Sequence, residues 1–321
     1  MKKRVAVLYG GRSGEHEISH RSAKSIMEAM DPARYEIVPY VISKDGKWEP
    51  RPILPEPGSN PDIDVVFIAL HGTFGEDGTV QGLLELADLP YVGAGVLASA
   101  VSMDKEMMKR VAAAHSLPVV EYSVVPECGE WSFTPEFPMF VKPANLGSSV
   151  GISKVHNEDE LAQALDLAHS FDRKVIVERA IVGREFECAV LGNQEPVAAT
   201  PCEILPSRDF YDDEDTYLLD KARTVLPADL SPEQTAEMQR LAVECYRAVE
   251  CEGMARVDFL LESATGKLFI NEINTIPGFT SISMYPKMWE HAGLPMSKLI
   301  DRLIELAFQR HAAKQRLRYS K

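Results

Sequence analysis

The first apolar segment predicts a buried strand at the start of a layered fold. Residues 5–9 are continuously apolar, and Gly10 and Gly11 follow directly. Such a run is typical of a parallel strand that is covered on both faces. The further elements that the pattern predicts here are helices at 16–30 and 76–86 and strands at 35–41 and 65–70. Strands that alternate with helices predict an α/β layer structure, which we assign to a first domain over residues 1–94.

From residue 102 onward the pattern changes, and two further units are predicted. In a central unit, 95–187, the predicted elements are helices at 103–115 and 158–168 and strands at 119–125, 137–141 and 174–178. In a C-terminal unit, 188–321, they are helices at 232–249 and 295–313 and strands at 254–262 and 267–274. Gly266, between the last two strands, fits a hairpin turn.

Composition is that of an ordinary soluble protein with roughly two or three domains of about 150 residues each. The chain has 321 residues, of which 45% are hydrophobic and 26% are charged. Acidic residues outnumber basic ones by 48 to 34, which gives a net charge of −14. A surface this negative repels phosphate backbones, so we expect no nucleic-acid partner. A few local cations can still hold a small anionic ligand.

The cysteines and the N-terminus indicate a cytoplasmic protein. Five cysteines are scattered without a C-x-x-C pair, which is typical of reduced thiols that serve in packing. They are Cys128, Cys188, Cys202, Cys245 and Cys251. The apolar run after the basic N-terminus is too short for a signal peptide, and no stretch approaches the roughly 18 apolar residues of a membrane span. We therefore expect no membrane partner.

The predicted hairpin carries the strongest chemical signal. Arg256 and Asp258 lie two residues apart on one strand, and Glu272 and Asn274 do so on the other. Side chains two residues apart share a face of a strand, so pairing across the hairpin brings three oxygen-bearing side chains together. Such oxygens are the ligands that Mg²⁺ prefers, usually with water and substrate phosphates. The set predicts a magnesium site, and the alternative is a solvated polar face at a sheet edge.

A second signal follows a strand that ends at Lys142. The segment 145–151 contains two glycines and two serines. Glycine lets backbone N–H groups approach a phosphate, and hydroxyls add donors. The segment is not a Walker loop, and residues 10–14 lack the G-x-G-x-x-G spacing of dinucleotide-binding folds. It predicts a phosphate-binding loop, and the alternative is a flexible turn.

Other charged residues are ambiguous by themselves. The positive charge of Lys105 near a helix N-terminus is unfavourable with respect to the helix dipole unless an anion lies nearby. The alternative is that Lys105 is an ordinary surface lysine. Glu15 follows a glycine turn and is compatible with a charged helix start. His71 follows a parallel strand, where such sheets bind ligands, although a lone histidine is more often structural. Segment 211–217 places four acids between two tyrosines, so it is either a disordered loop or a lid over a pocket.

Together these motifs resemble the D-alanine–D-alanine ligases of the ATP-grasp superfamily. The matching segments run in the family's order over essentially the whole chain. They are LYGGRSGEHEIS (8–19), ALHG (69–72), GEDG (75–78), MDK (103–105), FVKP (140–143), GSSVG (147–151), GMARVD (253–258) and NEINTIPGFT (271–280). The resemblance implies a three-domain ATP-grasp fold, α/β with α+β in the ATP-binding part. It also implies ATP-dependent ligation of two D-alanines for peptidoglycan precursor synthesis in the cytoplasm.

The resemblance further implies which residues surround ATP, which it places between the central and C-terminal domains. Lys105 and Lys142 hold the phosphates, and the loop at 147–151 closes on them. The other cofactor-binding residues are Gly147, Ser148 and Ser149 in that loop and Glu178, Arg179, Ile181 and Glu185 around the adenine and ribose. Two Mg²⁺ ions, for which Mn²⁺ can substitute, are held by Asp258, Glu272 and Asn274, with Glu272 bridging them.

For the amino acids, the resemblance implies a second set of roles. These are Glu15, Ser148 and Tyr217 at the first D-alanine, Arg256 and the Gly278 N–H at the tetrahedral intermediate, and Ser283 at the second carboxylate. ATP converts the first carboxylate into an acylphosphate, and the amine of the second D-alanine then attacks it, with release of phosphate. A lid over 207–223 keeps water away from the acylphosphate.

The lid departs from the family pattern at one position. The family usually has Ala-Lys-Tyr there, whereas this chain has Asp215-Thr216-Tyr217. Thr216 cannot supply a phosphate-binding cation, so either Lys221 or Arg223 replaces it or nucleotide affinity is weaker. Tyr217 favours D-alanine over D-lactate as second substrate. The alternatives are another ATP-grasp carboxylate–amine ligase, a D-alanine–D-lactate ligase and a non-catalytic nucleotide-binding regulator. The partners expected for the chain are D-alanine and ATP, and a homodimer is an open expectation.

Overall fold

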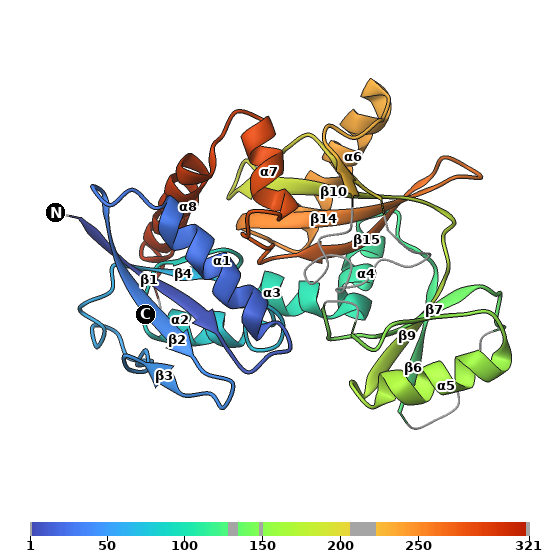
Figure 1. The fold of residues 1–321 in the computed structure, drawn as a ribbon, viewed down its shortest axis with the longest axis horizontal. Coiled ribbons are helices and arrows are strands. Elements are labelled where there is room, and N and C mark those ends of the chain that lie inside the picture. Colours follow the sequence, from blue (N-terminus) through green and yellow to red (C-terminus); the bar gives the residue numbers. More distant parts are fainter. Residues whose placement is uncertain (1, 128–133, 148–149, 206–222, 319–321) are drawn as a thin grey trace.

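The structure is a computed structural model that describes residues 2–127, 134–147, 150–205 and 223–318. Predicted features that lie outside these residues are Cys128, Ser148, Ser149, Thr216, Tyr217, Lys221 and most of the lid. Within the described ranges, helices combine with three separate sheets, which confirms the expected fold class (Figure 1). No helix in this part of the chain has the length and apolar character to cross a bilayer.

A largely parallel sheet forms the N-terminal part of the molecule. Its strands, in spatial order, are β3 (Trp48–Glu49), β2 (Tyr35–Ile42), β1 (Lys3–Gly10), β4 (Val65–Ile68) and β5 (Tyr91–Val92). The apolar run in β1 is fully buried, as its composition predicts. Helix α1 (His16–Ala29) packs on β1, and α2 (Thr79–Leu86) follows β4. The loops after β1 and β4 therefore meet at the carboxyl edge of the sheet.

An antiparallel sheet forms the central part. Its strands, in spatial order, are β6 (Tyr122–Pro126), β9 (Lys174–Arg179), β7 (Met139–Pro143) and β8 (Ser153–Val155), and α5 (Glu158–His169) packs on it. The helix predicted at 103–115 is α4 (Lys105–Ala114), and a further helix that was not predicted, α3 (Val96–Met103), precedes it. Asp104 separates them because its extended backbone ends α3 while its side chain accepts a hydrogen bond from Met107 N at 3.0 Å and caps α4.

A second antiparallel sheet forms the C-terminal part. Its strands, in spatial order, are β13 (Arg223–Val225), β12 (Cys202–Leu205), β10 (Gly183–Gly192), β14 (Gly253–Glu262) and β15 (Leu268–Asn274), with β11 (Val197–Ala198) paired to β10. Helix α6 (Pro232–Ala248) packs on this sheet, and α7 (Met284–His291) lies against β10. The predicted hairpin of β14 and β15 is confirmed, and Gly266 at its turn has the positive φ of 70° that favours glycine.

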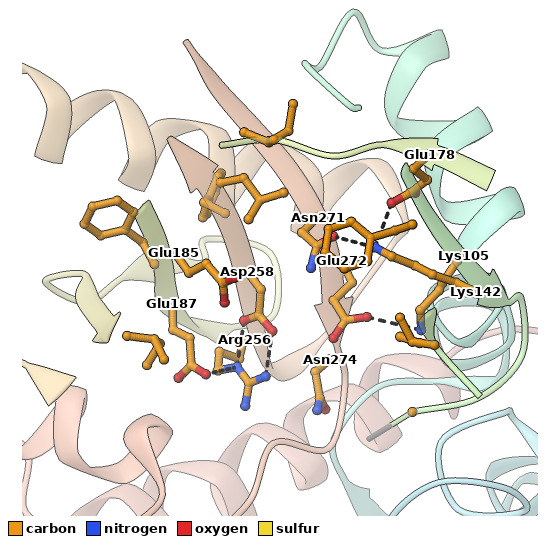
Figure 2. A pocket seen from close by; sticks show the side chains of 18 of the residues that line it. Lys105, Lys142, Glu178, Glu185, Glu187, Arg256, Asp258, Asn271, Glu272 and Asn274 are labelled. Atoms are coloured by element: carbon orange, nitrogen blue, oxygen red, sulfur yellow. Dashed lines mark hydrogen bonds and ion pairs between the residues drawn. The ribbon is translucent and has the colours of Figure 1, made fainter. Parts of the chain in front are cut away.

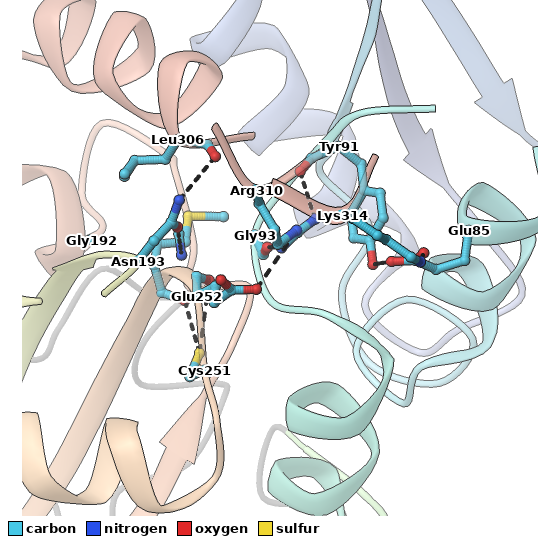
Figure 3. A network of polar contacts seen from close by, with 12 residues as sticks. Glu85, Tyr91, Gly93, Gly192, Asn193, Cys251, Glu252, Leu306, Arg310 and Lys314 are labelled. Carbon is cyan, nitrogen blue, oxygen red and sulfur yellow. Dashed lines mark hydrogen bonds and ion pairs between the residues drawn. The ribbon is translucent and has the colours of Figure 1, made fainter. Parts of the chain in front are cut away.

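The last helix, α8 (Met296–Lys314), returns to the N-terminal sheet and packs on β4 and β5 (Figure 1). Its Arg310 also reaches the start of β14, where Gly253 lies so close to Gly93 that an added Cβ would stand 3.2 Å from the Gly93 backbone (Figure 3). The N-terminal and C-terminal sheets consequently share one hydrophobic core. The four described cysteines are buried free thiols, as their scattered positions predict.

Candidate active site

A cavity of about 210 Å³ lies where the three sheets face one another (Figure 2). Thirteen of the predicted site residues line it: Glu15, Lys105, Lys142, Gly147, Glu178, Arg179, Ile181, Glu185, Arg256, Asp258, Glu272, Asn274 and Gly278. Ser283 does not line it. That residue precedes α7, and its hydroxyl lies 2.8 Å from the Thr280 hydroxyl and accepts a hydrogen bond from Thr280 N.

The β14–β15 hairpin brings its polar side chains together as the sequence predicts. Asp258 pairs with Glu272 in the strand register, and Arg256 pairs with Asn274. The Arg256 guanidinium donates two hydrogen bonds to the Asp258 carboxylate, at 2.7 and 2.6 Å (Figure 2). Burial nevertheless raises the pKa of Asp258, because desolvation outweighs the attraction of Arg256. The carboxylate is thus desolvated and held by one cation.

Two lysines from the central part of the molecule reach polar side chains of β15. Lys105, the first residue of α4, lies 3.2 Å from Glu272 Oε2 and donates a hydrogen bond to Leu146 O at 2.7 Å. This lysine is the main cause of a lowered pKa at Glu272. Lys142, on β7, donates to Asn271 Oδ1 at 3.3 Å (Figure 2). Both ammonium groups point into the cavity, where they can meet an anionic ligand.

Glu187 is a cavity residue that the sequence reasoning missed. It lies on β10 opposite Asp258, and its Oε1 is 3.4 Å from Arg256 Nε. Its Oε2 is buried without a hydrogen-bond partner in the described residues, and burial raises its pKa to about 7. The available signal was the two-residue spacing from Glu185, which places both side chains on one face of the strand. Arg256 is therefore held between Glu187 and Asp258.

The N-terminal sheet contributes Glu15 to the cavity. Glu15 precedes α1, and an added Cβ on Gly72 or Gly147 would stand 3.0 or 3.4 Å from its carboxylate oxygens. Gly72 has a φ of 71°, so both the conformation and the close approach require glycine. Glu76, another residue that sequence reasoning missed, accepts a hydrogen bond from Gly72 N at 2.7 Å. It thereby fixes the loop against which Glu15 rests.

His71 serves a structural role as well as lining the cavity. Its Nδ1 donates to Ile276 O at 3.1 Å, so its Nε2 accepts the hydroxyl hydrogen of Ser22 at 2.9 Å. Burial lowers the pKa of this imidazole to about 4, which keeps it neutral. The ring thus connects α1 to the segment that follows β15.

The acidic set fits a divalent cation. Two carboxylates and an amide, from Asp258, Glu272 and Asn274, line the cavity together, and hard oxygen ligands of this kind suit Mg²⁺ when water and phosphate complete its coordination. Glu187, whose Oε2 has no hydrogen-bond partner among the residues that the structure describes, lines the same cavity. No group of three or more His, Cys, Asp or Glu in the described ranges forms a metal site by itself. The fit therefore depends on the amide and on ligands from the substrate.

Family models match most of the chain. A model for the D-ala D-ala ligase C-terminus matches residues 111–305, and one for the D-ala D-ala ligase N-terminus matches 4–57 and 52–94. The chain belongs to the D-alanine–D-alanine ligase family. A ligase of that name from Solibacter usitatus is 67% identical over 329 residues, with 100% of both chains covered. The recognition made from the sequence motifs is confirmed.

Solved structures of the family have the same fold. The D-alanine–D-alanine ligase from Coxiella burnetii is 41% identical with a TM-score of 0.88, and the match covers 98% of this chain and 96% of that one. A Bacillus anthracis ligase complexed with ATP is 28% identical with a TM-score of 0.82, and the match covers 97% and 99%. The ATP-grasp ligase architecture is therefore confirmed for this member of the family.

Proposed function

We propose that the cavity is the site at which this D-alanine–D-alanine ligase uses ATP to join two D-alanines for peptidoglycan precursor synthesis. The proposal rests above all on one observation: two lysines, a cluster of carboxylates and Glu15, contributed by the N-terminal, central and C-terminal parts of the molecule, line a single cavity. Ammonium groups suit the phosphates of ATP, and a buried carboxylate suits the ammonium of an amino acid. A purely structural cluster would have no need of the open volume between them.

ATP lies between the central and C-terminal parts in this proposal. Lys105 and Lys142 bind its phosphates, and the loop that begins at Gly147 covers them; Ser148 and Ser149 of this loop remain predictions from the motif. Arg179, Ile181 and Glu185 surround the nucleoside. The ATP complex of the Bacillus anthracis relative supports ATP as the nucleotide.

Asp258, Glu272 and Asn274 would hold two Mg²⁺ ions, or Mn²⁺ in their place. When bound, the ions neutralise negative charge on the transferring phosphoryl group. Arg256 already pairs with Asp258, and Lys105 already pairs with Glu272. In this proposal, these two side chains therefore lie within reach of the phosphates and of the reacting carboxyl group.

The reaction has two steps. A carboxylate oxygen of the first D-alanine, whose ammonium is held by Glu15, attacks the terminal phosphorus of ATP, and the bond to ADP breaks. The amine of the second D-alanine, after losing a proton, attacks the carbonyl carbon of the acylphosphate. Arg256 and the backbone N–H of Gly278 stabilise the resulting oxyanion. Its collapse breaks the bond to phosphate and leaves the dipeptide.

Several further expectations belong to this proposal. Residues 1–94, 95–187 and 188–321 act as three domains, and the lid at 207–223 closes over them with Tyr217 completing the first-substrate site. Ser283 binds the carboxylate of the second D-alanine. The buried free thiols support a reducing, cytoplasmic location, and the chemistry requires neither a nucleic acid nor a membrane. A homodimer is compatible with it.

One assay tests the proposed function directly. Phosphate release from MgATP is measured with D-alanine, L-alanine or D-lactate as substrate. We expect release with D-alanine alone to exceed release with L-alanine, and the product to be D-alanyl-D-alanine. Equal release without amino acid, or a preference for L-alanine, would refute the proposal.

A further inference from the structure

A buried ionic triad lies at the wall of the cavity, which Glu178 and Lys142 line and Lys109 does not. Glu178 on β9 holds a lysine at each of its oxygens: Lys109 Nζ is 2.7 Å from Oε1, and Lys142 Nζ is 2.7 Å from Oε2. The side chains of Lys109 and Glu178 are only 1% and 2% exposed. Lys109 and Glu178 are thus almost fully buried, and Lys142 is the more exposed member of the triad.

The two lysines differ in what else they can reach. Lys142 lines the cavity and also contacts Asn271, so it can meet a ligand. Lys109 lies one helical turn after Lys105 on α4, does not line the cavity, and stands 5.7 Å from the centre of the Tyr122 ring. Lys109 consequently cannot touch a nucleotide, and the proposed reaction does not use it.

The charges in the triad explain why a second lysine is present. Burial by itself would raise the pKa of Glu178, but the two lysines outweigh it and lower this pKa to about 2. Glu178 is therefore a permanent buried anion. If Lys142 were its sole partner, a phosphate that attracted Lys142 would leave an uncompensated buried carboxylate, which is strongly unfavourable.

We propose that Lys109 is a positioning residue for nucleotide binding. It balances the charge of Glu178, so that the ammonium group of Lys142 can turn from Glu178 to the phosphates of ATP. The inference rests on the proposed function in one respect, namely that Lys142 binds phosphate. With Lys109 in place, the triad carries one surplus positive charge beside the cavity. Without it, Glu178 and Lys142 neutralise each other, and ATP competes with Glu178 for Lys142.

The test compares the dissociation constant of MgATP, measured by calorimetry without amino acid, in four variants and the wild type. Lys109→Met should weaken MgATP binding by about tenfold or more, because a buried charge is left without compensation when Lys142 moves. The double variant K109M/E178Q should bind MgATP within about threefold of Glu178→Gln, since without the carboxylate Lys109 has nothing to balance.

Lys174→Met is the matched control. Lys174, on the same strand as Glu178, pairs with Asp104 and Glu106 at the start of α4 and lies outside the cavity. Its loss removes an ion pair between the same strand and helix, so it should change the thermal midpoint but leave MgATP binding within about twofold. At saturating MgATP, the KM for D-alanine of Lys109→Met should also remain within about twofold, because Glu15 does not contact the triad.

Two results would overturn the inference. One is a dissociation constant of folded Lys109→Met for MgATP that equals that of the wild type or does not exceed that of Lys174→Met. The other, which remains available if Lys109→Met does not fold, is a double variant that binds about tenfold more weakly than Glu178→Gln. Since these constants are measured without turnover, they stand even if the phosphate-release assay were to refute the ligase reaction.

Discussion

Replacement of Arg310 by methionine should loosen the attachment of the N-terminal sheet to the rest of the protein. Arg310 lies on α8, and its guanidinium donates to Tyr91 O at 2.9 Å and to Gly93 O (Figure 3). It also lies 3.9 Å from Glu252 Oε2 and 4.1 Å from the centre of the Tyr91 ring. One side chain therefore joins the last strand of the first sheet to the segment that leads into β14.

The contacts of Arg310 set the size of the effect. Its side chain is only 13% exposed, so water replaces few of its hydrogen bonds. A hydrogen bond from a charged donor contributes about 1.5–3 kcal/mol, and the contact with the ring adds about 0.5–1 kcal/mol. Methionine keeps the apolar stem but strands two carbonyl groups. We expect Arg310→Met to lower the free energy of unfolding by about 2–4 kcal/mol.

Urea denaturation and steady-state kinetics together test this prediction. Lys314→Met is the control, because Lys314 pairs with Glu85 at a more exposed place on the same helix. This substitution should lower the free energy of unfolding by less than about 1 kcal/mol. Arg310→Met should also raise the KM for D-alanine, since Glu15 and Arg256 come from the two parts that it joins, while MgATP binding changes little. Stability within about 0.5 kcal/mol of the wild type would refute the reasoning.

Three further predictions concern the site. Glu272→Gln should abolish phosphate release from MgATP and D-alanine, because the residues that would hold the proposed metal ions lose a negative charge; near-wild-type turnover of the folded variant would contradict the metal set. His71 has a pKa lowered to about 4 from 6.5, so between these pH values the unfolded chain binds a proton that the folded one excludes. Stability should therefore fall as the pH drops from 6.5 to 4, and in His71→Gln this fall should be smaller by up to about 3.5 kcal/mol, which follows from 2.5 pH units at about 1.4 kcal/mol each. Urea denaturation at several pH values measures this difference, and identical pH slopes would speak against a buried neutral imidazole. Tyr217→Phe should raise the use of D-lactate relative to D-alanine while the KM for ATP stays nearly constant; a change in the KM for ATP alone would mean that Tyr217 is misplaced in our reading of the lid.

The sequence by itself determined the elements and the parts of the site that depend on short-range geometry. A continuous apolar run becomes the central strand β1 because such a run can be buried on both faces. The two-residue period of the strands predicts that Arg256 shares a face with Asp258 and that Glu272 shares one with Asn274. The register that sets Asp258 opposite Glu272 also needs the β-bulge between Asp258 and Phe259, which shifts the pairing by one residue. The ordered motifs were also sufficient for the family, since they extend over nearly the whole chain.

Tertiary structure decided which charges meet. The sequence places Glu178 at the end of a strand, but its two lysine partners come from positions 36 and 69 residues earlier in the chain. Likewise, Glu187 reaches Arg256 only because β10 pairs with β14, and α8 returns to a sheet that begins some three hundred residues before it. Electrostatic energies depend on distance and on burial. Both are set by packing between segments remote in sequence, so no local pattern encodes them.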